Sequence, residues 1–191
     1  MLKNLTIRSR MIFVIGFLCL LSIAIGILGI MSLGAANASV KTLYEDRVLA
    51  LGQLQAVLSL MQANQLTLAT ATSGTPDGYA AAADEVGARI GEINERWKAY
   101  MATYLTPEEK ALAASFIDSR RKFVEGALVP AMAALRAGDA DAATRLVRGR
   151  LGELFRPAQA DMKALVQLQF DISKAEYEDA EARFRSARLA A

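Results

Sequence analysis

The sequence predicts an all-α protein, an antiparallel up-down-up-down four-helix bundle preceded by one N-terminal transmembrane helix. An uncharged apolar run at residues 11–33 predicts the transmembrane helix. Beyond it, apolar residues recur at alternating steps of four and three, the spacing of helices packed lengthwise against one another. No stretch alternates with period two for long enough to form a strand.

The apolar run is long enough to cross a bilayer, because a helix over residues 11–33 rises about 35 Å. A cleaved signal peptide is the alternative, since Ala36-Asn37-Ala38 fits a cleavage pattern. The apolar core of a signal peptide has only about 7–15 residues, fewer than the run at 11–33, so we favour an uncleaved anchor. Both interpretations export the rest of the chain.

Charges beside the apolar run predict its orientation. No acidic residue occurs before Glu45, and the basic residues ahead of the run are Lys3, Arg8 and Arg10. The positive-inside bias therefore predicts a cytoplasmic N-terminus at residues 1–10, the transmembrane helix at 11–33 and an exported bundle at 34–191.

The first two bundle helices are expected at residues 40–73 and 79–104, separated by a turn rich in Gly, Pro and Asp. Since the first proline is Pro76, we expect the membrane helix to run directly into the first bundle helix. The inward positions of the first are Val40, Tyr44, Arg47, Leu51, Leu54, Leu58, Met61, Gln65 and Leu68. Those of the second are Val86, Ile90, Ile93, Trp97, Tyr100 and Tyr104.

The third helix has a strong start signal, in which Thr106 caps, Pro107 takes the first helical position and Glu109 completes a capping box. Pro130 is a candidate position for a kink, and the helix should end near Gly138. Its inward positions are Leu112, Phe116, Ser119 and Phe123. After a short helix capped by Asp139, the fourth should follow Gly149, Gly152 and Pro157, with Leu151, Phe155, Ala158, Met162, Leu165, Leu168, Ile172 and Ala175 inward.

Composition argues against catalysis. The chain has no histidine, one cysteine, and no nucleotide-binding or zinc-protease motif. We therefore expect no enzyme activity, no metal and no cofactor. The net charge is +2, and the three basic residues before the apolar run account for the excess, so we expect no nucleic-acid partner. One cluster of basic residues remains, which we interpret as the solvent-exposed edge of a helix: Arg145, Arg148, Arg150 and Arg156.

Four segments carry a resemblance to a known family: LYEDRVLALGQLQAV (43–57), LRAGDADAATRL (135–146), LFRPAQADM (154–162) and AEYEDAEARFRSAR (175–188). In this order, behind a basic-then-apolar anchor, they resemble the N-terminal sensory half of methyl-accepting chemotaxis proteins with a Tar-like four-helix-bundle domain. The resemblance implies a homodimer in the bacterial inner membrane, with a periplasmic bundle and the first helices of two subunits facing each other. It also implies a membrane-distal ligand and a piston-like shift of the fourth helix.

The aspartate-binding residues of the family are not present. Where aspartate-sensing members carry arginines on the first helix and a threonine on the fourth, this chain has Asn64, Ala69, Ser73 and Ala158. Aspartate recognition is therefore not expected. Other bundles of the family resemble receptors for dicarboxylic, tricarboxylic or aromatic acids, bound within one subunit.

Polar residues at inward positions suggest where a small organic acid would bind, because guanidinium groups match carboxylates and buried polar groups are costly without partners. For any one of them, setting helix register or forming a surface ion pair is the more ordinary explanation. Trp97, Tyr100 and Phe123 are expected in the core. As a group, the candidate site residues are Asn64, Gln65, Thr67, Tyr104, Arg120, Arg121, Arg156 and Gln159.

These expectations describe the ligand-sensing domain of a transmembrane chemoreceptor that binds an organic acid and transmits a helix displacement. A sensor domain of a histidine kinase or cyclase, and a membrane-anchored structural bundle that binds a partner protein, are the alternatives. The chain stops at Leu189-Ala190-Ala191, where a second transmembrane helix would be expected, so we interpret it as a fragment; a complete single-anchor protein is the alternative.

Overall fold

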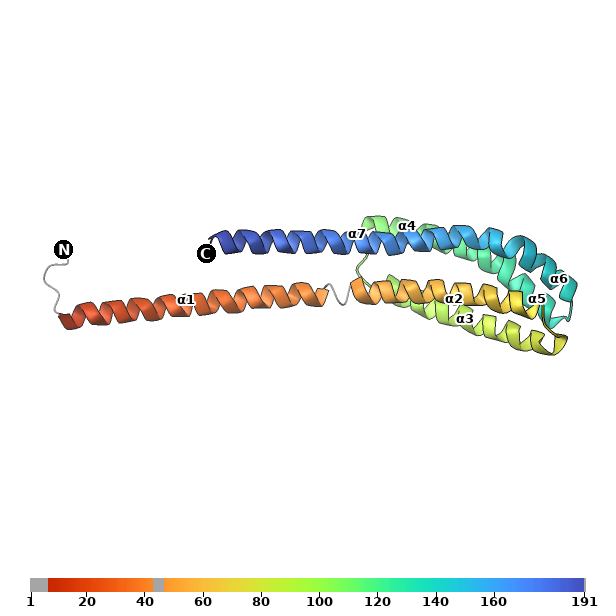
Figure 1. Ribbon diagram of the computed structural model, residues 1–191, viewed down its shortest axis with the longest axis horizontal. Coiled ribbons are helices and arrows are strands. Elements are labelled where there is room, and N and C mark those ends of the chain that lie inside the picture. Colours follow the sequence, from red (N-terminus) through yellow and green to blue (C-terminus); the bar gives the residue numbers. More distant parts are fainter. Residues whose placement is uncertain (1–6, 43–46, 191) are drawn as a thin grey trace. The chain divides into compact units, whose positions relative to one another are not determined.

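The computed structural model describes residues 7–42 and 47–190, and this part of the chain is helical, with short turns and no strand. The chain forms two units, Met1–Tyr44 and Glu45–Ala191. Figure 1 shows one helix in the first unit and a bundle in the second.

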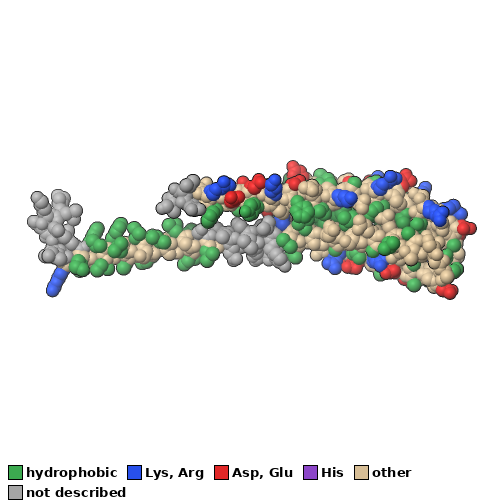
Figure 2. All heavy atoms as spheres, viewed as in Figure 1, with side chains coloured by type: hydrophobic (Ala, Val, Ile, Leu, Met, Phe, Trp, Pro, Cys, Tyr) green, Lys and Arg blue, Asp and Glu red, His purple; other side chains and the backbone are tan. Residues whose placement is uncertain are grey.

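The first unit consists of helix α1, Ile7–Thr42. It contains Met11–Met31, the segment of the described chain whose length and hydropathy (2.9) would allow it to cross a membrane. The side chains of Met11–Met31 are exposed, and Figure 2 shows apolar side chains along this segment. A helix that is apolar all round suits a lipid environment. The expected continuation of this helix into the bundle, with Tyr44 on its inward side, falls on 43–46, outside the described residues.

Helices α2 (Leu49–Ala71) and α3 (Tyr79–Met101) form an antiparallel hairpin. The connection contains a 3₁₀ turn, Pro76–Gly78, which begins with proline where no amide donor is required. The turn residues predicted from the sequence therefore separate these helices as expected.

The third rod runs from Pro107 to Arg136 as α4 (Pro107–Phe123), a π-helical turn η3 (Val124–Leu128) and α5 (Val129–Arg136). The capping box at its start is confirmed. The expected kink at Pro130 takes the form of this π turn. Since proline cannot donate to the carbonyl four residues earlier and crowds it, a wider turn just before it relieves the conflict.

The fourth rod runs through α6 (Ala140–Leu146), a second π turn η4 (Val147–Leu151) and α7 (Gly152–Ala190). Gly138 precedes it with φ of 73°, a conformation that favours glycine. Asp139 caps α6, because its Oδ1 accepts the Ala142 N–H at 2.8 Å. The chain stays helical through Gly149 and Gly152, because the π turn joins α6 directly to α7.

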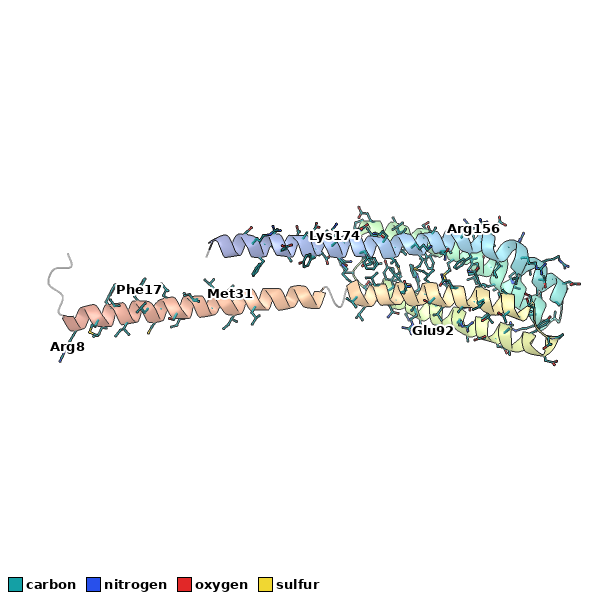
Figure 3. All side chains as sticks on the ribbon, viewed as in Figure 1. Arg8, Phe17, Met31, Glu92, Arg156 and Lys174 are labelled. Atoms are coloured by element: carbon teal, nitrogen blue, oxygen red, sulfur yellow. The ribbon has the colours of Figure 1, made fainter. Side chains whose placement is uncertain are left out.

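The four rods pack in a ring, α2 against α3 and α7, α3 against α5, and α4 against α7. This confirms the predicted all-α, up-down-up-down bundle. Side chains fill the space between the rods (Figure 3), and α7 continues beyond the ends of α2 and α4 (Figure 1). The expected core aromatics are buried; ring centroids lie 5.1 Å apart for Trp97–Tyr100 and 4.6 Å for Trp97–Phe116.

The buried faces differ from the predicted inward positions at several places. Ala175, predicted inward, is exposed, and at Leu51 and Leu112 the buried residue is the neighbouring Ala50 or Ala113. Asn64 is fully buried on α2 and the neighbouring Gln65 only half-buried. On α7, Gln169 is fully buried and Leu168 half-buried. Tyr104, predicted inward, is exposed. A strict alternation of fours and threes drifts from the 3.6-residue period of a straight helix, so adjacent residues exchange places on the buried face.

Candidate ligand-binding site

Polar contacts within the bundle connect neighbouring rods and show which residues lie beside each other. Each joins a different pair of helices: Arg89 Nη1 donates to Thr67 Oγ1 (2.7 Å), Arg120 Nη2 to Asn94 Oδ1 (2.7 Å), and Ser119 Oγ to Asp161 Oδ2 (2.6 Å). Arg120 therefore lies in the middle section of the bundle, whereas Thr67, four residues before the end of α2, lies nearer the α2–α3 turn and lines a hollow there.

Arg120 lies beside a surface hollow of about 260 Å³ between α3 and α4. Ile90, Ile117 and Val124 contribute apolar walls, and the other lining residues are Asn94, Arg121 and the acidic Glu125. The Nε atom of Arg120 is buried and has no hydrogen-bond partner. Burial lowers the pKa of Arg120 from its ordinary value, but a guanidinium stays charged in proteins. A half-buried cation with an unused donor is suited to a carboxylate.

Arg121 points to solvent and is engaged in ion pairs on its own helix. Its Nη2 donates to Asp118 Oδ1 at 2.6 Å, and its Nη1 lies 3.9 Å from Glu125 Oε2. The hydrogen bond to Asp118 raises the pKa of Arg121. Adjacent arginines diverge by about 100° on a helix, so only Arg120 turns towards the bundle.

Asn64 is the candidate site residue with the deepest position, with 0% of its surface exposed. Neither Oδ1 nor Nδ2 has a hydrogen-bond partner in the protein. Three residues further along α2, Thr67 accepts the Arg89 bond, and Gln65 is half-buried between them. A buried amide without partners lowers stability, so its presence here suggests a requirement other than folding.

Replacing Asn64 with leucine, a side chain of similar shape, is expected to stabilise the protein by about 1–3 kcal/mol, because it removes the unpaired amide. Urea unfolding of the full chain in detergent micelles, followed by the fluorescence of Trp97, measures the change. Gln167→Leu, at an exposed position of α7, is the matched control and should change stability little. A destabilised Asn64→Leu variant would show that the amide is satisfied in solution.

The α7 candidates lie at different depths. Arg156 is exposed and projects outward from α7 in Figure 3. Gln159 is half-buried, two residues before Asp161, whose Oδ1 and Oδ2 accept bonds from Ser115 and Ser119. Of the two, Gln159 is the one that lies with the middle section of the bundle.

Tyr104 does not lie with the other candidates. It is 69% exposed in the turn between α3 and α4, whereas Arg120 is 13 residues beyond Pro107. A helical rise over that distance separates the two levels by roughly 20 Å. The expectation of a common height was therefore wrong for Tyr104, because the inward pattern of α3 ends before the turn.

Sequence reasoning did not identify a buried polar cluster at the end of the bundle where α2 begins. We call Arg47, Glu109, Gln169 and Glu176 the Arg47 cluster. Arg47 donates from Nη2 and Nε to the two carboxylate oxygens of Glu176 at 2.8 and 3.4 Å, and its Nη1 lies 3.7 Å from Glu109 Oε1. Three rods of the bundle therefore meet at one guanidinium.

Glu109 has a structural role on α4 in addition to this contact. Its Oε2 accepts the Thr106 backbone N–H at 2.6 Å, and its Oε1 accepts a hydrogen bond from Gln169 Nε2. Burial, and then the charge of Glu109, raises the pKa of nearby Tyr100 to about 12. The sequence predicted an inward position for Arg47 and a capping box for Glu109. It contained no pattern that predicts a contact between these two residues.

Two further hollows lie on the bundle surface. One of about 680 Å³ lies between α2 and α3 near their connecting turn, lined mainly by small and hydroxyl side chains such as Thr70 and Ala82. The other, about 510 Å³, lies where the π turns approach each other, with Lys122 and Arg150 at its edge. Within the described residues, no group of three potential metal ligands occurs.

The outward face of α2 carries no charged side chain, and α2 as a whole contains none. Its exposed positions follow one another at steps of four and three: Val48, Gly52, Gln55, Ser59, Gln62, Leu66 and Ala69. An uncharged stripe of this length is unusual for a helix that faces only water, and it has the spacing of a helix-packing surface.

A helical bundle behind a candidate membrane span is the architecture of a receptor sensor domain, and residues 1–173 match the family described as Tar ligand binding domain homologue. The chain belongs to this family. Among curated proteins, the methyl-accepting chemotaxis protein NahY of Pseudomonas putida is 27% identical over 190 residues, 98% of this chain. The chain spans 35% of the length of that relative. No solved structure matches the chain. The resemblance inferred from the four sequence segments is thus confirmed.

Proposed function

We propose that this chain is the periplasmic sensor domain of a transmembrane chemoreceptor and that it binds a small organic acid beside Arg120. The family and the similarity to a methyl-accepting chemotaxis protein support the sensor role. The candidate span Met11–Met31 supports attachment to a membrane. We assign no catalytic activity to the domain.

The observation that carries the ligand class is the state of Arg120. Its guanidinium is half-buried beside a hollow, its Nη2 is used by Asn94, and its buried Nε is unused. A carboxylate accepting from a half-buried guanidinium forms a charge-assisted hydrogen bond, about twice as strong as a neutral one. The apolar wall at Ile90 and Ile117 would favour an acid with a hydrocarbon or aromatic part.

The remaining candidates have graded roles in this proposal. Asn64, Gln65, Thr67 and Gln159 would adjust to the ligand from α2 and α7. Arg121 and Arg156 would attract an anion from the surface. Tyr104 is left out because of its distance along the bundle.

Orientation and assembly follow from charge. The basic residues ahead of the span support a cytoplasmic N-terminus and a periplasmic bundle. The uncharged outward face of α2 would pack against the same face of a second copy, as the family resemblance implies. A homodimer of this kind would bury the exposed Leu66 and Val48.

Thermal unfolding of the full chain in detergent micelles tests the ligand class, with succinate, citrate and benzoate as the probes. At a concentration of about 100 times its Kd, a bound acid stabilises by roughly 2.7 kcal/mol, or about 5–10 °C in Tm for a chain of this size. The Arg120→Gln variant should lose most of that shift, because a charged donor is replaced by a neutral one.

The matched control is Arg96→Gln, which removes an exposed arginine paired with Glu92 at 3.2 Å on α3. It should respond to the probes as the unmodified chain does. An acid-induced shift that persists in Arg120→Gln would remove Arg120 from the site, and no shift with any of the three acids would contradict the ligand class.

A further inference from the structure

The Arg47 cluster connects α7 to the rest of the bundle at two points. Arg47 binds Glu176 through two hydrogen bonds, and its Nη1 donates to Gln169 Oε1 at 3.5 Å. Gln169 and Glu176 are seven residues apart, two turns of the same helix face, about 10 Å along the axis. Sliding α7 along its axis therefore changes both contacts together.

We infer that the Arg47 cluster is a two-position lock on α7, in which Arg47 exchanges Glu176 for Glu109 as its main partner when α7 slides. In the position observed here, Glu176 provides the bidentate contact at 2.8 and 3.4 Å. Glu109 lies at 3.7 Å, close enough to take over after a small movement.

Glu109 is suited to remain in place while α7 moves. It is fully buried, and both its side chain and its backbone are fixed to Thr106 by the capping box. Glu176, in contrast, keeps 41% of its side chain exposed and can be hydrated when released. A buried arginine that loses a carboxylate carries a large energetic penalty, so a second carboxylate within reach makes the displaced position accessible.

Other ion pairs of α7 could not act in this way. Lys174–Glu178 and Arg185–Glu181 lie within the helix and are exposed, so they travel with it. The second polar connection of α7 to a neighbour, Asp161 to the hydroxyls of Ser115 and Ser119, can follow a small shift because hydroxyl groups rotate. The Arg47 cluster is thus where axial position is set among the contacts described.

The biological use of the lock rests on the proposed function, because a sensor that signals by displacing α7 needs two defined axial positions of this helix. The existence of the lock can be tested without any ligand. Failure of the test would leave the sensor proposal intact, and failure of the acid screen would leave the lock intact.

Spin labels at Thr70→Cys on α2 and Lys163→Cys on α7, in a Cys19→Ala full chain, report axial sliding. By helical rise the two exposed positions differ by roughly 25 Å along the bundle, so their separation follows the position of α7. The labelled chain is diluted with unlabelled chain in nanodiscs. Glu176→Gln should add a second distance population, shifted by about 1–2 Å or more.

The matched control is Glu178→Gln, two residues away on α7 and more exposed, which should leave one population. Labels at Thr70→Cys and Glu95→Cys, on α2 and α3, should not respond to either variant. If Glu176→Gln gives the same distribution as Glu178→Gln, the lock is excluded.

A thermal measurement tests the exchange of partners separately. Glu176→Gln alone should lower Tm little, because Glu109 compensates Arg47. The double variant Glu109→Gln/Glu176→Gln should lower Tm by more than the sum of the two single changes, because it removes both of these carboxylates from the buried guanidinium. Additive effects would show that Arg47 does not exchange between them.

Discussion

Replacing Glu109 with alanine is expected to lower the free energy of unfolding by about 2–5 kcal/mol, because buried hydrogen-bond donors lose their acceptor while Arg47 keeps Glu176. Glu109 is fully buried and lies 3.7 Å from Arg47. The change also removes the acceptor for the Thr106 backbone N–H and for Gln169. Urea unfolding monitored by the single tryptophan, Trp97, provides the measurement.

The preceding residue offers a control for this result. Glu108 lies in the same first turn of α4 but is exposed, so Glu108→Ala should change stability by less than about 0.5 kcal/mol. If the two alanine variants unfold at similar urea concentrations, Glu109 contributes only the ordinary helix-dipole effect of an acidic first-turn residue, and the Arg47 cluster is not an energetic centre of the bundle.

Truncating Phe116 to alanine is expected to cost about 3–5 kcal/mol, because a fully buried ring is removed from a closely packed core. Phe116 packs against Trp97 at 4.6 Å, and Trp97 in turn contacts Tyr100. The loss of helical circular dichroism with urea measures the change without relying on the altered tryptophan environment.

Ile117→Ala is the control for the aromatic core, since Ile117 is the next residue and 48% exposed. It should reduce stability far less than Phe116→Ala, while an effect on acid binding would be informative because Ile117 lines the hollow beside Arg120. Equal destabilisation by both variants would place Ile117 in a buried interface that the single chain does not show.

Features governed by local chemistry were predictable from the sequence. The capping box at Thr106 and Glu109 depends on residues three positions apart, and the Asp139 cap likewise needs only its own turn. The number and order of the rods follow from helix period and turn residues, so the bundle was predicted correctly. The resemblance carried by four short segments then identified the family.

Features that depend on rotation about a helix axis were predicted less well. Asn64 and Gln65 are neighbours, and an error of one position exchanges a buried residue for a half-buried one. The same holds for Arg120 and Arg121, which the sequence proposed together and the structure separates. Tyr104 failed because α3 ends at Met101, and helix ends are poorly defined by periodicity.

The Arg47 cluster could not be predicted, because its bonds connect residues 122 and 129 positions apart. Nothing in the local sequence of Gln169 marks it as buried, since Leu168 next to it is the more apolar choice. Only the packing of three rods brings these polar groups together, and there they compensate one another.

The two π turns have a consequence for how this chain can change during evolution. Val124–Leu128 and Val147–Leu151 contact each other and bracket the α5–α6 hairpin. Each π turn accommodates one extra residue without changing the faces that the helix buries before and after it, so deleting one residue from either turn would restore regular α-helix and leave the buried face of the hairpin inward. Single-residue changes of length are therefore tolerated at either turn independently, so one-residue alignment gaps among relatives should concentrate at these two places.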